Sequence, residues 1–439
     1  MQINSFEKKR RRSDTLSAFF LIFGFTVLSM NIYATVASPD FLASWLAGKA
    51  WVAGETQNIY PPLEHGLFDL IAPRAWYEAL TVGTETEEVF PFIYPPIWAV
   101  LFGELTKVTN YETLRTIAAL INPVLLSFCI LLAGRVCERR FPVVPTLIIG
   151  MIFFSFSAIG QIALMQNQFQ ILVSFLILLS IERARNGHEI IGGTALALAA
   201  GIKLYPAIFI ILFWAAGYRK ATLAFVATGL ALGLTSLALT GWPLHAIFLN
   251  AVSTISNTVL VTPVSWSFDP LVGQIFFEDT LVKRPFPDWG YMYDLVPEDG
   301  LGFFYMPKPW LWQMISTLML IGTLIVGALM IRRAHRSGAD SGWVWAFIMG
   351  LFALVNPLSW SYHFIVVAAF APFFVFRIGL TRGVPWIVAI IALTSNFAPD
   401  LAYWLQGRFH WPLVPFQPFG TILMTVLVGS FGYSAYRKY

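Results

Sequence analysis

Asp40 is the residue best placed in this sequence to do chemistry. It follows the first long apolar stretch, residues 16–36, by only a few positions, and a tryptophan-rich, helix-prone segment, residues 41–54, comes directly after it. A carboxylate at a membrane surface can act as a general base towards a substrate held in the bilayer. An aspartate just before a helix is also typical of an N-cap, and the sequence leaves both roles open.

Two further ionisable side chains stand in apolar surroundings. Lys203 is the one cation within the apolar stretch 190–217. An ammonium there needs an anion such as a lipid phosphate, a cavity, or a route by which it snorkels to the interface. His363 ends the polar segment 356–363, whose Asn, Ser, Trp and Tyr side chains could form a polar wall for sugar hydroxyls or a phosphate. A hydrogen-bonded structural role is the alternative for that histidine.

Polar groups near two other predicted helix ends complete the candidate set. Gln166, Asn167, Gln168 and Gln170 crowd one of them, where contact with a ligand and hydrogen bonding between helices are equally expected. Arg115 begins another span and could bind an anion or anchor the membrane interface.

Familiar catalytic motifs are missing from the sequence. It contains no HExxH, P-loop, GxSxG or glycine-rich dinucleotide turn, which argues against ATP hydrolysis and serine-type hydrolysis. No motif requires a cofactor; a divalent metal is compatible with the chemistry, but no ligand spacing supports one. No nucleic-acid partner is expected. Cys129 and Cys137 are the only cysteines, and we expect neither a disulfide framework nor a metal site from them.

The elements that must position these residues are membrane helices. Hydrophobic residues make up 57% of the 439 positions and charged residues 12%, and apolar runs recur along nearly the whole chain. The sequence therefore predicts an all-α polytopic membrane protein with a single domain, residues 1–439. The first apolar run is longer than the core of a signal peptide, so we interpret it as an uncleaved first helix.

The basic clusters set the predicted topology. If each of them lies in the cytoplasm, an even number of crossings separates any two, which predicts about 12 transmembrane helices with both termini cytoplasmic. Most acidic residues, which were not used to build this arrangement, then fall outside. Two large external loops remain, residues 37–112 and 241–309. Within the first, residues 92–108 are predicted to be re-entrant or to lie along the membrane surface, with a short true span as the alternative.

Several short motifs follow one another in a consistent order along the chain. They are Asp40-Phe41 with Trp45, Ala47-Gly48, Ala50, Gly54 and Ile59-Tyr60; then Phe92-Ile93-Tyr94-Pro95-Pro96; then Gly201-Ile202-Lys203-Leu204-Tyr205-Pro206; and finally Pro357-Leu358-Ser359-Trp360-Ser361-Tyr362-His363. This series resembles the polyprenol-phosphate-mannose-dependent mannosyltransferases of glycosyltransferase family 87, within the GT-C class of membrane glycosyltransferases.

The resemblance implies an inverting transfer of a sugar, a hexose such as mannose, from a polyprenyl-phosphate carrier to a lipid- or glycan-linked acceptor. The site would lie on the external, periplasmic side of the inner or plasma membrane. Asp40 would be the base and His363 would orient acceptor or phosphate. The candidates for binding substrate or lipid phosphate are Lys203, Arg115, Tyr94, Gln168, Tyr205, Trp360 and Tyr362.

Two departures from the family pattern leave the donor sugar and the acceptor open. Asn167-Gln168 stands where Gly-Gln is usual, and Ser265-Trp266-Ser267 stands where a charged or amide residue is usual. One carboxylate with dispersed donors fits inversion better than a retaining double displacement. A transporter or flippase for a lipid-linked glycan is the main alternative, and it predicts an ionisable relay near the bilayer midplane. A scaffold subunit of an envelope-assembly complex is the third. The hypothesis that the protein is an enzyme requires Asp40, Lys203 and His363 to converge on one pocket.

Overall fold

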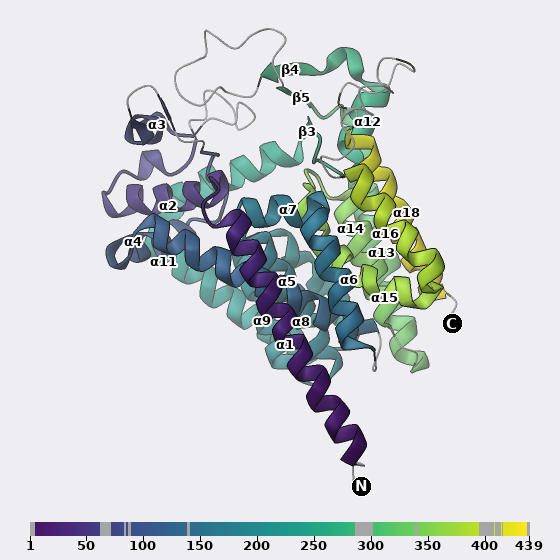
Figure 1. The fold of residues 1–439 in the computed structure, drawn as a ribbon. Coiled ribbons are helices and arrows are strands. Elements are labelled where there is room, and N and C mark those ends of the chain that lie inside the picture. The colour runs from purple at the N-terminus through teal and green to yellow at the C-terminus, as the bar shows by residue number, and fades with distance from the viewer. Residues whose placement is uncertain are drawn as a thin grey trace.

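The computed structural model describes residues 5–61, 72–82, 85–86, 89–137, 141–285, 302–338, 341–394, 408, 414 and 416–436. Within these residues the protein is a bundle of helices with a few short strands at one end (Figure 1). The predicted all-α, polytopic class is confirmed.

Six of the described helices are long and apolar enough to cross a membrane. They are α1 (Ser5–Tyr33), α5 (Tyr111–Cys137), α11 (Arg219–Ser256), α13 (Trp310–Ser337), the continuous pair η5 (Ser361–Phe364) and α15 (Ile365–Ile378), and α18 (Phe416–Tyr436). A seventh span results if α6 (Val143–Phe156) and α7 (Ala158–Met165) are taken together, although they are bent by 69°. The bend lies at Ser157, whose extended backbone interrupts the helix.

The other helices that the charge pattern counted as spans are shorter. They are α8 (Gln170–Arg185), α9 (Glu189–Ile202), η3 (Tyr205–Phe209) with α10 (Ile210–Ala215), α14 (Gly342–Val355) and α16 (Leu380–Thr394). A helix rises 1.5 Å per residue, so 14 residues reach only about 21 Å along the axis, less than the hydrocarbon core of a bilayer. By length, the described helices give six or seven spans.

Both predicted external loops contain regular structure. The first holds α2 (Pro39–Val52), η1 (Thr56–Asn58), α3 (Arg74–Leu80), the strand pair β1 (Thr81–Val82) and β2 (Glu85–Thr86), and α4 (Ile97–Val108). The second holds β3 (Thr258–Val261), α12 (Phe268–Phe276), η4 (Glu278–Thr280), β4 (Val282–Pro285) and β5 (Gly302–Pro307), and the three strands pair antiparallel in the order β3-β5-β4. Figure 1 shows α3, β3, β4, β5 and α12 at the end of the bundle away from the N-terminus, with α2 and α4 on one flank of the bundle.

The second predicted loop, residues 241–309, begins in helical structure. Within α11 the chain kinks at Gly241, where that loop was expected to begin, and then resumes a helix that ends at Ser256. Gly241 has φ 73°, a left-handed conformation that costs glycine little, so the chain bends there and resumes a helix. The apolar residues after the kink therefore belong to a second helical segment and not to an irregular loop.

Helices α2 and α4 pack closely against each other. A Cβ atom on Gly48 would lie 2.6 Å from the backbone carbon of Phe102, so only glycine allows this approach. Segment 92–108, predicted to be re-entrant or interfacial, forms α4 over its last 12 residues, and α4 is not among the helices long and apolar enough to span. The packing places Asp40, in the first turn of α2, beside the chain that leads into α4.

Two contacts tie the second loop to the bundle. In α12, the Asp269 carboxylate accepts hydrogen bonds from Lys308 Nζ at 2.7 Å and from Trp312 Nε1 at 2.9 Å, and all three side chains are buried. The segment before α12 forms a β-bridge with the chain before η5: Trp266 N–H donates to the Ser359 carbonyl at 2.7 Å, and Ser361 N–H donates to the Val264 carbonyl at 2.7 Å. The segment that carries His363 is therefore held by the second of the two predicted loops.

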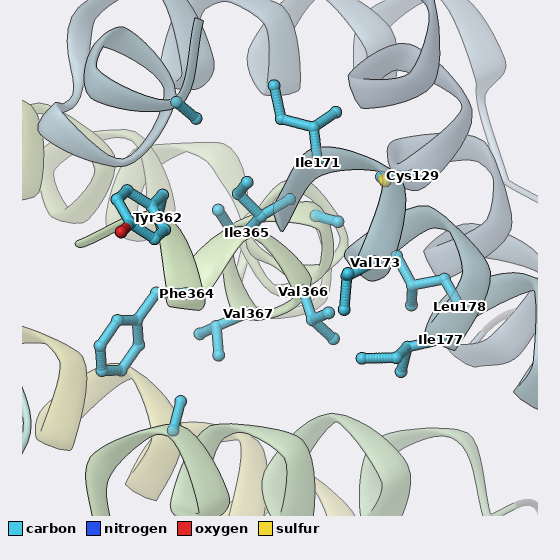
Figure 2. Close-up of a cluster of buried hydrophobic side chains, with 14 of the residues drawn as sticks. Cys129, Ile171, Val173, Ile177, Leu178, Tyr362, Phe364, Ile365, Val366 and Val367 are labelled. Atoms are coloured by element: carbon cyan, nitrogen blue, oxygen red, sulfur yellow. The ribbon is translucent and has the colours of Figure 1, made fainter. Parts of the chain in front are cut away.

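The core beneath the site is apolar. Figure 2 shows buried side chains of α5, α8 and α15 facing one another, among them Cys129, Ile171, Ile177 and Val366, with Tyr362 in the same cluster. Cys129 and Cys137 are both free and buried. This packing fixes α8 against α15, and so sets the position of the two chain segments, after α7 and before α15, that bear site residues.

Candidate active site

Asp40 lies in the first turn of α2, two residues after the N-cap. The N-cap position is Ser38, so of the two roles that the sequence left open for Asp40, the N-cap role is excluded. Pro39 occupies the first helical turn, where its fixed φ and missing N–H favour a helix start. The Asp40 carboxylate instead accepts a hydrogen bond from Gln168 Nε2, and Asp40 N–H donates to Gln166 Oε1 at 3.3 Å. Released from capping, the half-buried carboxylate is available to a substrate.

Tyr94 and Gln168 form the wall behind Asp40. Tyr94 Oη donates to Gln168 Oε1 at 3.5 Å, and Tyr60 Oη donates to the Tyr94 carbonyl at 2.8 Å, so both the ring and its backbone are held. Tyr94 and Gln168 are both buried. The Gln168 amide is thereby oriented with its nitrogen towards Asp40, which suits an ionised carboxylate.

Lys203 presents its ammonium between two tyrosine rings. Helix α9 ends at Ile202, Lys203 is extended, and Trp98 Nε1 donates to the Gly201 carbonyl at 2.9 Å, which fixes this turn. Lys203 Nζ lies 5.8 Å from the centroid of the Tyr94 ring and 5.1 Å from that of Tyr362, within the range of cation–π attraction. The ring faces attract the ammonium without forming conventional hydrogen bonds to it, so its N–H groups can still donate to a ligand.

Asp40 and Lys203 interact electrostatically without touching. The Lys203 charge lowers the pKa of Asp40, but no ion pair within hydrogen-bonding reach joins these two described residues. Burial is the larger effect and raises the pKa of the Asp40 carboxyl to about 6, against which the Lys203 ammonium and the Gln168 amide act. A carboxyl with that pKa is a better proton acceptor than an ordinary aspartate and is still ionised at neutral pH.

His363 is held in one orientation and one tautomer. Trp360 N–H donates to His363 Nδ1 at 2.9 Å, so Nδ1 carries no proton and a neutral imidazole must carry it on Nε2. The ring lies 4.9 Å from that of Tyr362 and 6.0 Å from that of Tyr205, centroid to centroid. His363 therefore offers an Nε2–H donor to whatever binds beside it.

Tyr205 completes this side of the site. Gln170 Nε2 donates to Tyr205 Oη at 2.7 Å, which leaves the hydroxyl proton of Tyr205 for another acceptor. Tyr205 and His363 also line a small cavity, together with the polar Asn356 and Ser359 and the apolar side chains Ile177, Phe209, Met349, Phe352, Ala353 and Val366. This cavity adjoins the Asp40–Lys203 region through Tyr205 and His363 but does not include Asp40 or Lys203.

The structure brings together eight of the nine predicted site residues. Asp40, Tyr94, Gln168, Lys203, Tyr205, Tyr362 and His363 form one continuous group linked by the contacts above, and the Trp360 ring stacks on that of Tyr362 at 6.4 Å. Arg115 is the exception. Its guanidinium contacts Glu112, the Val36 carbonyl and the face of Tyr111, and neither Asp40 nor Lys203.

Sequence reasoning missed three residues that shape this group. Trp98 fixes the turn at Gly201, Ser38 anchors the start of α2, and Asn122 lies buried in a span near it. An asparagine within an apolar span is itself a signal for Asn122, because a buried amide requires a partner. Of the other histidines, His65 and His410 lie outside the described residues, and His245 bonds to Ser236 and Gly241 within α11. Within the described part of the chain, no three His, Cys, Asp or Glu side chains gather closely enough to hold a metal ion.

A multi-pass helical bundle with a carboxylate, an ammonium and an imidazole gathered at one end is the arrangement expected of a membrane-embedded transferase. The model of glycosyltransferase family 87 matches residues 92–357, more than half of the chain. The chain belongs to this family and is a membrane glycosyltransferase, which decides between enzyme and transporter in favour of the enzyme. No curated protein matches the chain. Lys203 lies within the matched residues, whereas Asp40 and His363 lie outside them.

Proposed function

We propose that this glycosyltransferase moves a hexose from a polyprenyl-phosphate carrier to a lipid- or glycan-linked acceptor, with inversion at the anomeric carbon. The observation that carries the proposal is that Asp40, Lys203 and His363, from three distant parts of the chain, lie close enough for Lys203 to act electrostatically on both of the others. A sugar phosphodiester already contains a leaving group, so the reaction needs only a base for the acceptor and donors for the phosphate.

In the proposed step, the Asp40 carboxylate takes the proton of an acceptor hydroxyl. The acceptor oxygen forms a bond to the anomeric carbon on the face opposite the phosphate, and the bond from that carbon to the phosphate oxygen breaks. The electron pair goes to the departing polyprenyl phosphate, which gains negative charge. Lys203 and the Nε2–H of His363 stabilise this charge as it develops. Tyr205, Trp360 and Tyr362 would bound the sugar.

The proposed topology follows the charge pattern. Both termini lie in the cytoplasm, about 12 segments cross or enter the membrane in a GT-C-like arrangement, and the site opens on the external side. The short helices α9, η3–α10, α14 and α16 support the higher number, because they are apolar even though none is long enough for an upright crossing. The whole chain then forms one domain around the site.

The direct test is an assay of the purified protein in lipid nanodiscs with defined donors. Polyprenyl-phosphate hexoses, mannose and glucose among them, should each be offered with a mixture of glycolipid acceptors, and the nucleotide-sugar forms of the same hexoses should serve as controls. We expect transfer from a polyprenyl-phosphate donor with inverted linkage. Transfer from nucleotide sugars alone, or retention at the anomeric carbon, would overturn the proposal.

The acidic side of the pH profile is a second expected result. Asp40 acts as a base only when ionised, so its protonation should lower kcat/KM by about tenfold for each pH unit below about pH 6. The rate should be restored when the pH is raised. In Gln168→Leu the carboxylate loses a hydrogen bond, the pKa of Asp40 should rise further, and the acidic limb should move to higher pH. A profile that stays flat well below pH 6 would exclude Asp40 as the base.

Two substitutions of His363 separate its two nitrogens. Glutamine places an amide N–H near the position of Nε2, whereas asparagine places its oxygen near Nδ1 and leaves the Nε2 position empty. We expect His363→Gln to keep transfer within about tenfold but to lower thermal stability, since Trp360 N–H loses its acceptor. His363→Asn should keep stability and lose about 100- to 1,000-fold in kcat. The reverse pattern, measured by transfer assay and thermal melting, would exclude an Nε2–H donor role.

A further inference from the structure

A turn of the chain between α7 and α8 holds the start of α2. Ser38 Oγ donates to the Met165 carbonyl at 2.8 Å and accepts from Asn167 Nδ2 at 3.0 Å. The two neighbours of Asn167 in this turn, Gln166 and Gln168, bond to the backbone N–H and the carboxylate of Asp40. Four consecutive residues, 165–168, therefore contact the three-residue segment that carries the proposed base.

Asn167 is the least ordinary member of this turn. Its φ is +45°, in the left-handed region that residues other than glycine seldom adopt, although asparagine tolerates it better than most. Its side chain is almost fully buried, with 2% exposed. With its nitrogen committed to Ser38, the Asn167 carbonyl oxygen faces α5, and there it meets a single donor.

That donor is Asn122, in the middle of the span α5. Asn122 Nδ2 donates to Asn167 Oδ1 at 3.0 Å, and the Asn122 side chain is buried, with 7% exposed. A polar amide inside an apolar span requires such a partner, since an unpaired buried amide is costly. The three side chains Asn122, Asn167 and Ser38 form an unbroken hydrogen-bonded relay from a membrane helix to the residue two positions before Asp40.

We propose that Asn122 and Asn167 are positioning residues that hold Asp40 in its working place, a proposal that rests on the proposed function of Asp40 as the base. Through these hydrogen bonds, the position of the membrane helix α5 fixes the position of the first turn of α2. Helix α2 begins outside the spans, so the segment at its start depends on such contacts for its position. The same turn carries the Gln168 amide, so moving the turn moves both the base and its hydrogen-bond partner.

The relay is suited to positioning because it is specific in direction. Each amide in it has its nitrogen and oxygen assigned by its partners, from Asn122 to Asn167 to Ser38 to the Met165 carbonyl. A displacement of a catalytic group by about 1 Å can cost about 100-fold in rate while substrate binding persists. Loss of the relay should therefore appear in kcat more than in KM.

Two variants break the relay at different points. Asn122→Leu removes the donor in α5 with little change in volume, and Asn167→Gly removes the middle amide while keeping a residue that accepts positive φ. Each is expected to lower kcat by roughly 10- to 100-fold with KM for donor and acceptor within about twofold. Because both act on one relay, the double variant should lose no more than the worse single variant. Ser127→Ala is the matched control, since Ser127 is buried in the same helix but bonds only to the Pro123 carbonyl.

A readout independent of transfer separates this inference from the proposed function. A hydrophobic carbodiimide modifies protonated carboxyls, and the extent of Asp40 labelling against pH, read by peptide mass spectrometry, reports its protonation. Lys203, Tyr94 and Tyr362 face Asp40 and are unchanged in the variants. If the Asp40 carboxylate is displaced from Gln168, it loses a hydrogen bond to its ionised form. The pH of half-maximal labelling should then rise by at least about half a unit, which corresponds to a roughly 3-fold increase in proton affinity. Ser127→Ala should leave that point unchanged.

The outcomes are distinct. Unchanged kcat and an unchanged half-labelling point in both Asn122→Leu and Asn167→Gly, or additive losses in the double variant, would overturn the positioning role. Loss of folded protein with normal kcat per folded molecule would also overturn it, because the relay would then serve stability alone. If the wild-type protein transferred no sugar from any polyprenyl-phosphate donor, the proposed function would fail, and the labelling curve would still decide whether the relay positions Asp40.

Discussion

Asp40→Asn is expected to lower kcat for sugar transfer by about 100- to 10,000-fold, the range that removal of a general base produces. The substitution changes one oxygen to an amide nitrogen of the same size, so the packing of α2 against α4 should persist. An amide cannot accept the acceptor proton at any useful pH. Because Asp40 contributes no charge that attracts the phosphate, KM for the donor should change little.

The measurement is single-turnover transfer in nanodiscs with thermal melting of the same samples. Glu55→Gln is the matched control, because Glu55 is an exposed acid that follows the same helix and whose carboxylate accepts a hydrogen bond from Asn58, away from the site. It should retain full activity. Near-normal transfer by Asp40→Asn, with the fold intact, would remove Asp40 from the base role, and Asp40→Glu should also be impaired because its carboxylate is displaced by one methylene.

Lys203→Met is expected to lower kcat/KM by about 100- to 1,000-fold, the usual loss when a donor to developing negative charge is removed. Methionine keeps much of the length of the lysine stem between the Tyr94 and Tyr362 rings, and it removes only the charge and the N–H donors. The loss should extend to binding of polyprenyl phosphate, since the product carries more negative charge on its phosphate than the donor.

Product inhibition distinguishes this variant from the first. Polyprenyl phosphate should inhibit Lys203→Met at least about tenfold less strongly than wild type, whereas its inhibition of residual transfer by Asp40→Asn should be unchanged. Lys49→Met is the control, since Lys49 is exposed on α2. Unaltered inhibition by polyprenyl phosphate in Lys203→Met would mean that its ammonium does not contact the phosphate.

The membrane class and the first helices could be predicted because apolar runs and basic clusters report directly on a bilayer. The first apolar stretch, residues 16–36, agrees within a few residues with the part of α1 that is apolar enough to span, Asp14–Tyr33. Gly241, where the second loop was expected to begin, ends the first helical segment of α11, but the second helical segment that follows it was not predicted. The strands β3, β4 and β5 had no clear signal, since they are short and β3 pairs with β5 and not with the next strand along the chain.

The site was predicted in part for a similar reason. Asp40, Lys203 and His363 are conspicuous because each is ionisable or polar next to apolar sequence. Arg115 gave the same signal, but Glu112, one helical turn away, takes its guanidinium. The contacts that position the group could not be read, because Gln168 reaches Asp40 across 128 residues and Trp98 reaches Gly201 across 103. Such partners depend on how helices meet and not on local pattern.

The lack of an ion pair between the described residues Asp40 and Lys203 has a consequence for the catalytic cycle. A salt bridge between them would neutralise both and would have to be broken each time substrates arrived. Because the two groups are not paired, the site without substrate keeps one negative and one positive group. An in-line displacement requires this arrangement. A proton is removed on one side of the sugar, and negative charge develops on the leaving phosphate on the other. Little of the binding free energy then goes into rearranging the protein, and more of it remains to lower the barrier.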